Sequence, residues 1–468
     1  MKSEIDTIAA IATPIGEGGI SVIRLSGSRA IAIAESVFKG KTCLGSARSH
    51  TAHFGRIADR KGNVIDEVVA TVFLEPNSYS GENTVEISCH GGILVTKRVL
   101  ELLLDSGARH AQPGEFTKRA FLNGRLDLSQ AEAVADLIHA RSDSAHRTSV
   151  RQLEGAISER IKQLRSKLID SIGLLELELD FTEEGLEFLD KTKFRQAIGE
   201  TTVEIDHLLE SFKAGRIYRE GVKVVIAGPP NAGKSSLLNA FLESNRAIVT
   251  NIPGTTRDTI EESVNIGGVA FRLVDTAGLR ETHDGIEREG VRRTEEEARN
   301  GEVVLVVVDA SEQAGTANRG KLQEFVAAIE SAGTKQIFVL NKCDLPTRPV
   351  MQVLASLGAR AGSIFVNISA KTRRGMDALQ KALVEAAFSG RTAEIDASET
   401  VTNARHFEAL RHAKRSLVLA LESLDQEQSS EFVAVDLRKS LDSLGEITGE
   451  VTTDEILNNI FSKFCIGK

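Results

Sequence analysis

The chain has 468 residues, of which 41% are hydrophobic, so it holds enough apolar material for about three packed domains. Its formal net charge of −9 argues against a protein that coats nucleic acid non-specifically, and leaves open a specific RNA contact through a local basic patch or a partner. No signal-peptide layout, C-x-x-C spacing or apolar run of about 20 residues is present, which predicts a cytoplasmic protein with reduced thiols and no membrane contact.

The first predicted domain, residues 1–122, is an α+β unit. Apolar runs separated by glycine-containing turns predict four strands, followed by one amphipathic run. The strands are Thr7–Ala12, Ser21–Leu25, Val68–Leu74 and Thr84–Ser88, and the amphipathic run is Ile93–Leu104.

The next region, residues 123–220, is predicted to be helical. An apolar residue recurs every three or four positions, which predicts a stripe along one helix face that packs against other helices. The stripe consists of Leu153, Ile157, Ile161, Leu164, Leu168, Ile172, Leu175 and Leu179.

Residues 221–388 carry the motifs of an α/β domain that binds a phosphorylated nucleotide. The apolar strand Val222–Ala227 leads into Gly228–Ser236, which fits the phosphate loop G-x-x-x-x-G-K-S/T, and a helix-like run follows. Glycines let the backbone turn successive N–H groups toward phosphate oxygens. We expect Lys234 to reach the β- and γ-phosphates and Ser235 to hold magnesium.

Two further strand ends carry polar motifs. Val269–Val274 predicts a strand that ends in Asp275-Thr276-Ala277-Gly278, where a carboxylate and a glycine N–H suit magnesium and the γ-phosphate. Ile337–Leu340 predicts a strand that ends in Asn341-Lys342-Cys343-Asp344. The Asp344 carboxylate can accept from the ring N–H and amino group of guanine, a pair that adenine lacks, so this motif selects GTP over ATP.

Ser369-Ala370-Lys371 suits the loop that closes over the base. The four signals come in the order and the strand-end positions of one GTPase domain, so together they predict a GTP hydrolase.

The residue that orients the attacking water is not the usual one. Many GTPases place a glutamine directly after D-x-x-G, but this chain has Leu279, which cannot hold a water by hydrogen bonding. Glu287 is a candidate for that role; the alternative is a charge on a solvated turn or helix start.

The first switch loop is expected at Gly254–Asp258. A threonine hydroxyl there would complete magnesium coordination. Arg257 is either an internal arginine finger or the partner of Asp258 or another neighbour in a salt bridge. Asn231, just before Ala-Gly-Lys, could direct an amide oxygen toward a monovalent cation that neutralises transition-state charge.

Residues 389–468 are predicted to be a polar linker, Thr392–Thr402, followed by helices. We interpret the two helical flanks as one domain into which the GTPase domain is inserted. The helical stripes are Phe407, Leu410, Lys414, Leu417, Leu421 and Leu424, and then Val433, Leu437, Leu441, Leu444 and Ile447.

Motifs outside the nucleotide-binding region are more specific than the phosphate loop. They are Ala12–Ile20, Pro76–Glu82, His90-Gly91-Gly92, Pro113–Asn123 and Phe464-Cys465-Ile466-Gly467-Lys468. With these motifs and the inserted domain, the chain resembles the MnmE (TrmE) family of bacterial tRNA-modification GTPases over essentially its whole length.

The resemblance implies a multidomain fold: an α+β N-terminal folate-binding domain, an α-helical domain and an inserted α/β P-loop GTPase domain. It implies a homodimer formed through the N-terminal domain, residues 1–122, which also binds a 5-formyl-tetrahydrofolate-type carrier. It also implies that GTP is hydrolysed when potassium is bound and two GTPase domains meet. With the FAD-dependent partner MnmG, in a heterotetramer, it would add an aminomethyl or carboxymethylaminomethyl group to the wobble uridine of certain tRNAs. The alternative is a regulatory GTPase switch in RNA or ribosome assembly, without base chemistry.

The resemblance also implies roles for individual residues. It implies that Glu287 orients water, that Ser235 and Thr256 bind magnesium, and that Asn231, Thr250, Ile252 and Thr255 bind potassium. The GTP-binding residues are expected to be Asn231, Ala232, Gly233, Lys234, Ser235, Ser236, Thr250, Asn251, Ile252, Pro253, Gly254, Thr255, Thr256, Asp275, Thr276, Ala277, Gly278, Asn341, Lys342, Asp344, Ser369, Ala370 and Lys371.

The implied folate residues are Arg24, Glu86, Arg125 and Lys468. The two arginines suit a glutamyl carboxylate and Glu86 suits the pterin edge, although each of them alone equally suits a surface charge. Cys465 is a candidate functional thiol, with simple packing as the alternative.

Overall fold

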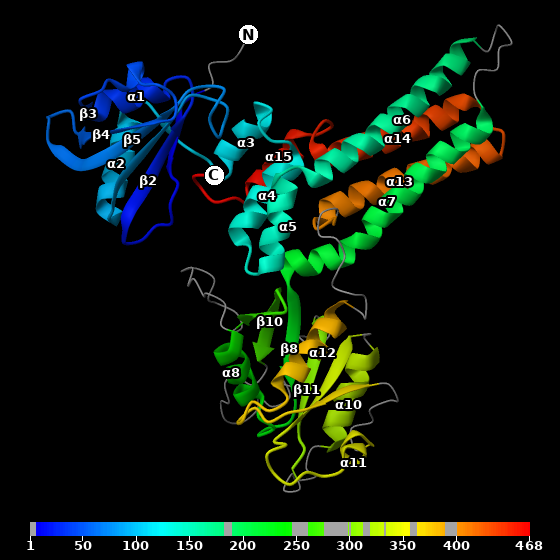
Figure 1. Cartoon of the computed structure of the whole chain (residues 1–468). Helices are drawn as coiled ribbons and strands as arrows, with labels where there is room; N and C mark the ends of the chain where they lie inside the picture. Colours follow the sequence, from blue (N-terminus) through cyan, green and yellow to red (C-terminus); the bar gives the residue numbers. More distant parts are fainter. Residues whose placement is uncertain are drawn as a thin grey trace. The chain divides into compact units, whose positions relative to one another are not determined.

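The structure is a computed structural model that describes residues 6–181, 190–245, 261–275, 298, 301–311, 319–331, 334–355, 363–388 and 400–468. The chain forms two compact units. One comprises Met1–Ala135, Gln152–Thr201 and His412–Lys468, and the other comprises Asp136–Arg151 and Thr202–Arg411. The predicted multidomain fold, with an α+β region, long helices and an α/β sheet region, is confirmed (Figure 1). The four predicted domain boundaries stay a prediction.

The first unit contains a sheet with the strand order β3-β4-β5-β6-β2-β1-β7 among the described residues. Neighbouring strands are antiparallel except β1 and β7. The strands are β1 (Ile8–Ile11), β2 (Gly18–Ser26), β3 (Phe38–Gly40), β4 (Thr51–Ala58), β5 (Val64–Phe73), β6 (Thr84–Gly91) and β7 (Arg109–His110).

Helices α1 (Ala30–Val37) and α2 (Ile93–Asp105) pack on one face of this sheet. Because side chains alternate along a strand, β2 buries Ile23 and Leu25 in that core while Arg24, between them, is on the other face. β6 likewise buries Val85 and Ile87 around Glu86. Arg24 and Glu86 are directly opposite each other in the β2–β6 register, so the core pattern itself brings them together.

The four predicted strands correspond to β1, β2, β5 and β6, but the sequence reading missed β3, β4 and β7. In β4, Gly55 and the polar residues His53 and Arg56 interrupt the apolar alternation on which the prediction depended. β5 begins at Val64 and not at Val68, because polar residues such as Asp66 interrupt the apolar pattern in the first residues of this strand.

The other helices of this unit include α6, along which the predicted apolar stripe is confirmed as a packing face from Ile157 onward. Leu153, predicted on the same helix, instead ends α5 (Asp143–Leu153), because a turn at residues 154–155 separates the two helices. Ile161, Leu164 and Leu168 are fully buried, and α6 packs against α14. A cross-helix contact joins the two, since Arg165 donates to the main-chain oxygen of Leu441 at 2.7 Å. These helices are α3 (Glu115–Leu122), α4 (Leu128–His139), α6 (Ala156–Phe181), α14 (Ser430–Thr448) and α15 (Asp454–Phe461), with a 3-10 turn at Leu44–Ser46.

The second unit contains a sheet with the order β13-β12-β11-β8-β10-β9 in the described part of the chain, parallel except for the β9–β10 pair. Its strands are β8 (Val222–Ala227), β9 (Glu261–Ile266), β10 (Val269–Asp275), β11 (Val303–Asp309), β12 (Lys335–Asn341) and β13 (Ile364–Asn367). Its helices are α5 (Asp143–Leu153), α8 (Lys234–Asn245), α10 (Arg319–Ser331), α11 (Val350–Ala355) and α12 (Met376–Phe388). Helices α4, α5, α7 (Lys191–Glu220) and α13 (Ala404–Asp425) have residues in both units.

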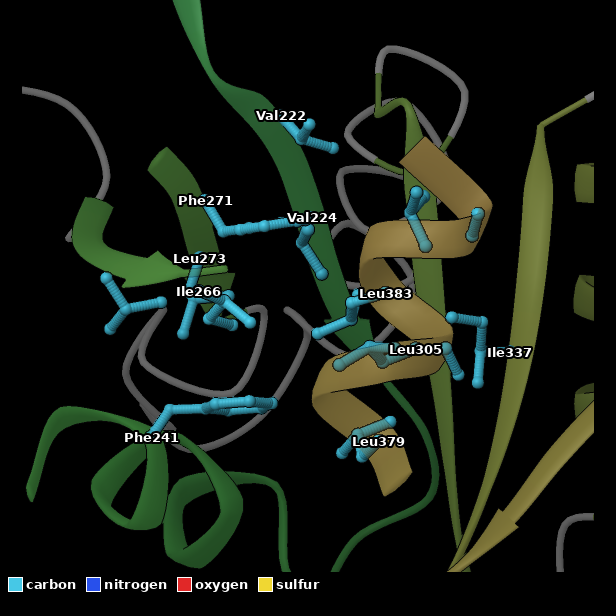
Figure 2. Packing of buried hydrophobic residues seen from close by; sticks show 14 of the residues in the cluster. Val222, Val224, Phe241, Ile266, Phe271, Leu273, Leu305, Ile337, Leu379 and Leu383 are labelled. Atoms are coloured by element: carbon cyan, nitrogen blue, oxygen red, sulfur yellow. The ribbon is translucent and has the colours of Figure 1, made fainter. Parts of the chain in front are cut away.

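Apolar residues cover both faces of this sheet, as expected for parallel strands with near-continuous apolar sequence. On one face, Phe241 of α8 and Leu379 and Leu383 of α12 gather with Leu305 of β11 and Phe271 of β10 (Figure 2). On the other face, α10 and α11 supply the covering residues. This packing fixes the strand ends at which the polar motifs lie.

Hydrogen bonds connect the turn between β9 and β10 to the start of α5. The main-chain oxygen of Gly268 accepts from Ser144 N at 3.1 Å and from Ser144 Oγ at 2.6 Å. The first turn of α5 is therefore attached to the sheet of the second unit. Within the described ranges, no helix combines the length and apolarity needed to cross a membrane.

Candidate functional site

The predicted phosphate loop connects β8, which is inside the sheet, to α8. Gly233 has a φ of +96°, and a Cβ there would lie 2.2 Å from Asn341 Nδ2. Gly228 has a φ of +150°, and a Cβ there would lie 2.1 Å from the Val307 oxygen. Only glycine fits at these two positions, and glycine allows the backbone conformation that a phosphate-binding loop needs.

A positive charge is held in the same loop. Lys234 Nζ donates to the main-chain oxygens of Gly228 at 2.9 Å and Pro229 at 3.0 Å. Asn231 has a left-handed φ of +62° and an exposed side chain at the rim of the loop. The loop and the N-terminus of α8 suit an anionic phosphate chain.

Asn341 ties the phosphate loop to the loops expected to hold the base. It ends β12, is 3% exposed, and donates through Nδ2 to the Ala232 oxygen at 2.9 Å. Its Oδ1 accepts from Ala370 N at 3.0 Å. One buried amide thus connects Ala232 with the Ser369-Ala370-Lys371 loop.

Asp344 is exposed and faces this same loop. Its hydrogen bond with the Ser369 side chain, together with the nearby Lys371 and Lys342 charges, holds the pKa of Asp344 below its ordinary value. A carboxylate that stays charged at neutral pH is the acceptor that guanine requires.

The structure therefore brings many of the predicted GTP-binding residues to one end of the sheet. Those described there are Asn231, Ala232, Gly233, Lys234, Ser235, Ser236, Asn341, Lys342, Asp344, Ser369, Ala370 and Lys371. The main chain of Asp275 ends β10, which pairs in parallel with β8.

Several predicted residues lie outside the described residues. They are Glu287, Leu279, Arg257 and Asp258, the segment Thr250, Asn251, Ile252, Pro253, Gly254, Thr255 and Thr256, and the run Thr276, Ala277 and Gly278. Their roles stay predictions.

Three of the four predicted folate residues form a second cluster, on the N-terminal sheet. Arg24 Nε and NH2 lie 2.8 and 2.7 Å from Glu86 Oε1. Arg24 NH1 donates to the Gly467 oxygen at 3.5 Å, next to Lys468. Burial and the Arg24 charge lower the pKa of Lys468, while Glu86 and Cys465 oppose that shift.

The C-terminal residues sit against β1. Gly467 has a φ of +98°, and a Cβ there would lie 2.2 Å from the Ile11 oxygen. The exposed Cys465 offers its main-chain oxygen to Gly114 N at 3.4 Å and to Lys468 N at 3.3 Å. The chain end is thus held beside the Arg24–Glu86 pair.

Arg125 is placed differently. It lines a surface cavity of about 340 Å³ with His50, Phe73, Asn77, Ser78 and Tyr79. Tyr79 joins the two places, because the Arg24 guanidinium lies 5.1 Å from its ring centre.

Sequence reasoning missed Tyr79 and Phe116 as site residues. The Phe116 ring centre lies 5.7 Å from the Arg24 guanidinium, so two aromatic rings hold this cation. The sequence did contain a signal for them, because Tyr79 lies in Pro76–Glu82 and Phe116 in Pro113–Asn123, two of the motifs on which the family resemblance rests.

Two family sequence profiles match the chain. The profile described as GTP-binding protein TrmE N-terminus matches residues 7–125, and the profile described as MnmE helical domain matches residues 128–465. Together they account for nearly the whole length of the chain.

Curated relatives match over the same length. The tRNA modification GTPase MnmE of Chlorobium phaeobacteroides is 47% identical over 470 residues, covering 99% of this chain and 98% of that protein. The protein of the same name from Cytophaga hutchinsonii is 44% identical over 468 residues, covering 100% and 99%. The one from Symbiobacterium thermophilum is 46% identical over 466 residues, covering 99% of each.

Proposed function

This chain belongs to the MnmE (TrmE) family of tRNA modification GTPases, and on this premise we propose that it couples potassium-dependent GTP hydrolysis to modification of the wobble uridine in certain tRNAs. It is a GTP hydrolase that acts in tRNA modification. The observation that carries the proposal is the buried Asn341 amide, which joins the phosphate loop to the base loops. This connection between the two loops is what we expect for a site that binds a single ligand with a phosphate chain at one end and a base at the other.

In the proposed reaction, the N–H groups of the phosphate loop and Lys234 bind the β- and γ-phosphates. Ser235 and Thr256 would hold magnesium, and Asn231, Thr250, Ile252 and Thr255 would hold potassium. When bound, these cations supply positive charge against the phosphate oxygens as the γ-phosphoryl group leaves. Asn231 supports this role through its exposed side chain at the rim of the loop.

The water that attacks the γ-phosphate needs an acceptor because Leu279 cannot supply one. We assign this to Glu287, whose carboxylate would accept a hydrogen bond from the water and orient it. The Asp344 carboxylate would accept from guanine and so set the preference for GTP.

The N-terminal cluster supports binding of a 5-formyl-tetrahydrofolate-type carrier. Both contacts between Arg24 and Glu86 use Oε1, and Oε2 is the oxygen we propose for the donors of the pterin edge. Arg125, in the aromatic cavity beside Tyr79, suits the glutamyl carboxylate of the same molecule. Lys468 would complete the site from the chain end.

We further propose a cytoplasmic homodimer that assembles with an MnmG-like flavoprotein into a heterotetramer acting on tRNA, with FAD on the partner. Here GTP hydrolysis would order the modifying site on each cycle.

The proposal is tested by deleting the gene and measuring wobble uridines in tRNA by mass spectrometry. We expect the modified nucleoside to disappear, to return with the wild-type gene, and to stay absent with Lys234→Ala, because phosphate binding is lost. Lys193→Ala, which changes an exposed lysine at the start of α7, is the matched control and is expected to restore modification.

Normal wobble uridines in the deletion strain would instead favour a regulatory switch in RNA or ribosome assembly. Altered ribosome profiles in that strain would strengthen this alternative.

A further inference from the structure

Asp309, which neither the motifs nor the family resemblance assigns, lies beside the predicted base loop. It is the last residue of β11 and is opposite Asn341, the last residue of β12. Its Oδ1 accepts from Ser311 N at 2.9 Å and from Ser311 Oγ at 2.7 Å. Its Oδ2 lies 2.7 Å from Lys342 Nζ.

Partial burial restricts the motion of the Asp309–Lys342 ion pair. The side chains of Asp309 and Lys342 are 21% and 34% exposed, and Ser311 is buried. Burial raises the pKa of Asp309, but the bonds from Lys342 and Ser311 outweigh it and leave the pKa below its ordinary value. The carboxylate is therefore charged at neutral pH and holds the ammonium group.

The Lys342 backbone is fixed as well. Its φ is +66°, in the left-handed region, and Cys343 N next to it donates to the Ile368 oxygen at 3.0 Å. Because the backbone and the ammonium group of Lys342 are both fixed, its four-carbon side chain can adopt few conformations.

A competing partner for the ammonium is close by. The Lys342 charge lowers the pKa of Asp344, so the two groups interact across the loop. If Lys342 were free of Asp309, it would pair with the carboxylate that guanine needs, since opposite charges in one loop attract strongly when partly desolvated.

We propose that Asp309 is a positioning residue for guanine recognition: it anchors the Lys342 ammonium away from Asp344, so that Asp344 stays open to the ring N–H and amino group of the base. This inference rests on the proposed GTP site. It explains why a carboxylate ends the strand next to the base loop, with one oxygen engaged by Ser311 and the other by Lys342.

The test measures GDP and inosine diphosphate binding to the full-length protein, because inosine lacks the exocyclic amino group. We expect Asp309→Asn to weaken GDP binding about tenfold and to reduce the preference for GDP over inosine diphosphate. KM for GTP should rise while kcat at saturating GTP stays within about twofold, since binding and not the chemical step is affected. Asp309→Glu should rescue much of the loss, and Asp377→Asn, on α12, is the matched control.

A double-mutant cycle separates positioning from simple structure. In a Lys342→Met background, Asp309→Asn should change GDP affinity by less than about twofold, because no ammonium remains to be held. If Asp309→Asn fails to fold, folding of Asp309→Asn/Lys342→Met supports the pairing, and unfolding of both contradicts it. Unchanged GDP affinity in Asp309→Asn, or an equal loss in both backgrounds, overturns the inference. Wild-type protein that does not bind GDP would instead overturn the proposed function.

Discussion

At the scale of single residues, the candidate phosphate loop is held by contacts that leave no room for a larger side chain. Gly233 packs against the Asn341 amide, which in turn holds Ala232 and Ala370. A change at Gly233 therefore disturbs the phosphate end and the base end of the site together. The backbone conformation at this position adds strain for any other residue.

We predict that Gly233→Ala weakens GTP binding by about 10- to 100-fold, because strain of ~1–3 kcal/mol and the displaced Asn341 amide oppose the loop geometry. Titration with a fluorescent GTP analogue measures this. Gly173→Ala is the matched control, since a Cβ at Gly173 in α6 meets nothing within 4 Å. Affinity equal to wild type for Gly233→Ala would mean that the loop adapts without cost.

At the scale of elements, ion pairs join α3 to β7, the edge strand of the N-terminal sheet, and to the segment before β1. The buried Arg119 contacts Glu82 at 3.1 Å, Glu115 at 3.0 Å and Asp6 at 2.8 Å. Arg109 of β7 pairs with Asp6 and Glu115 as well. The contacts connect the start of β1 with α3 and the loop before β6, which also carries Tyr79.

These pairs predict a loss of stability in acid. The Arg109 hydrogen bond is the main reason that the pKa of Asp6 is lowered. Burial raises the pKa of Glu115, but the Arg109 bond, the Gln112 backbone bond and Arg119 outweigh it, so this pKa is lowered too. Groups whose pKa is lower in the folded state stabilise the fold above their unfolded values of about 4, and this stabilisation disappears as the pH falls through the lowered values.

The expected result is a fall in melting temperature by circular dichroism between pH 5 and pH 3, and a smaller fall in Arg109→Gln. Arg56→Gln, which breaks the exposed pair with Glu67, should leave the pH dependence as it is in the wild type. The same pH dependence in Arg109→Gln and wild type would contradict this account.

At the scale of the whole molecule, the nucleotide-binding region is an insertion whose two connections meet. Ser211 Oγ, on the entering helix α7, accepts from Val401 N at 3.0 Å at the point where the described chain returns. Phe212 of α7 and Phe407 of α13 stack with their ring centres 4.4 Å apart. When the two ends of an inserted domain are adjacent, the insertion disturbs the surrounding domain little. The helical domain can therefore resume in the chain after the inserted region.

From the proposed potassium site, we predict GTP hydrolysis by the full-length protein to be at least about tenfold faster in potassium than in sodium at equal ionic strength. Asn231→Lys should abolish the difference, because a fixed ammonium replaces the proposed cation ligand. Asn459→Lys, on α15, adds the same charge at an exposed position and should keep the potassium response. Turnover assays at several protein concentrations measure both effects, and equal rates in the two salts would remove the potassium proposal.

Much of the fold and the nucleotide site was predictable from sequence because the signals are local. An apolar strand followed by a glycine-rich loop and a helix specifies its own geometry, and Asn341 and Asp344 are adjacent to a strand of the same kind. β4 was not predictable, because Gly55 and its polar neighbours are accommodated only by the strands on either side. For the same reason, no pattern indicated that Asp309 and Lys342, 33 positions apart, form an ion pair.

The sequence by itself determined the family, the order of the motifs and the residue types needed to bind a guanine nucleotide. Only the tertiary structure decided which side chains meet: Lys468 beside Arg24 and Glu86, Arg125 in a separate cavity joined to them through Tyr79, and Asp309 beside Lys342. The physical reason is that motifs record what a backbone does over a few residues. Contacts between strand ends and chain termini depend on how the sheets are ordered and what packs on them, which no local pattern contains.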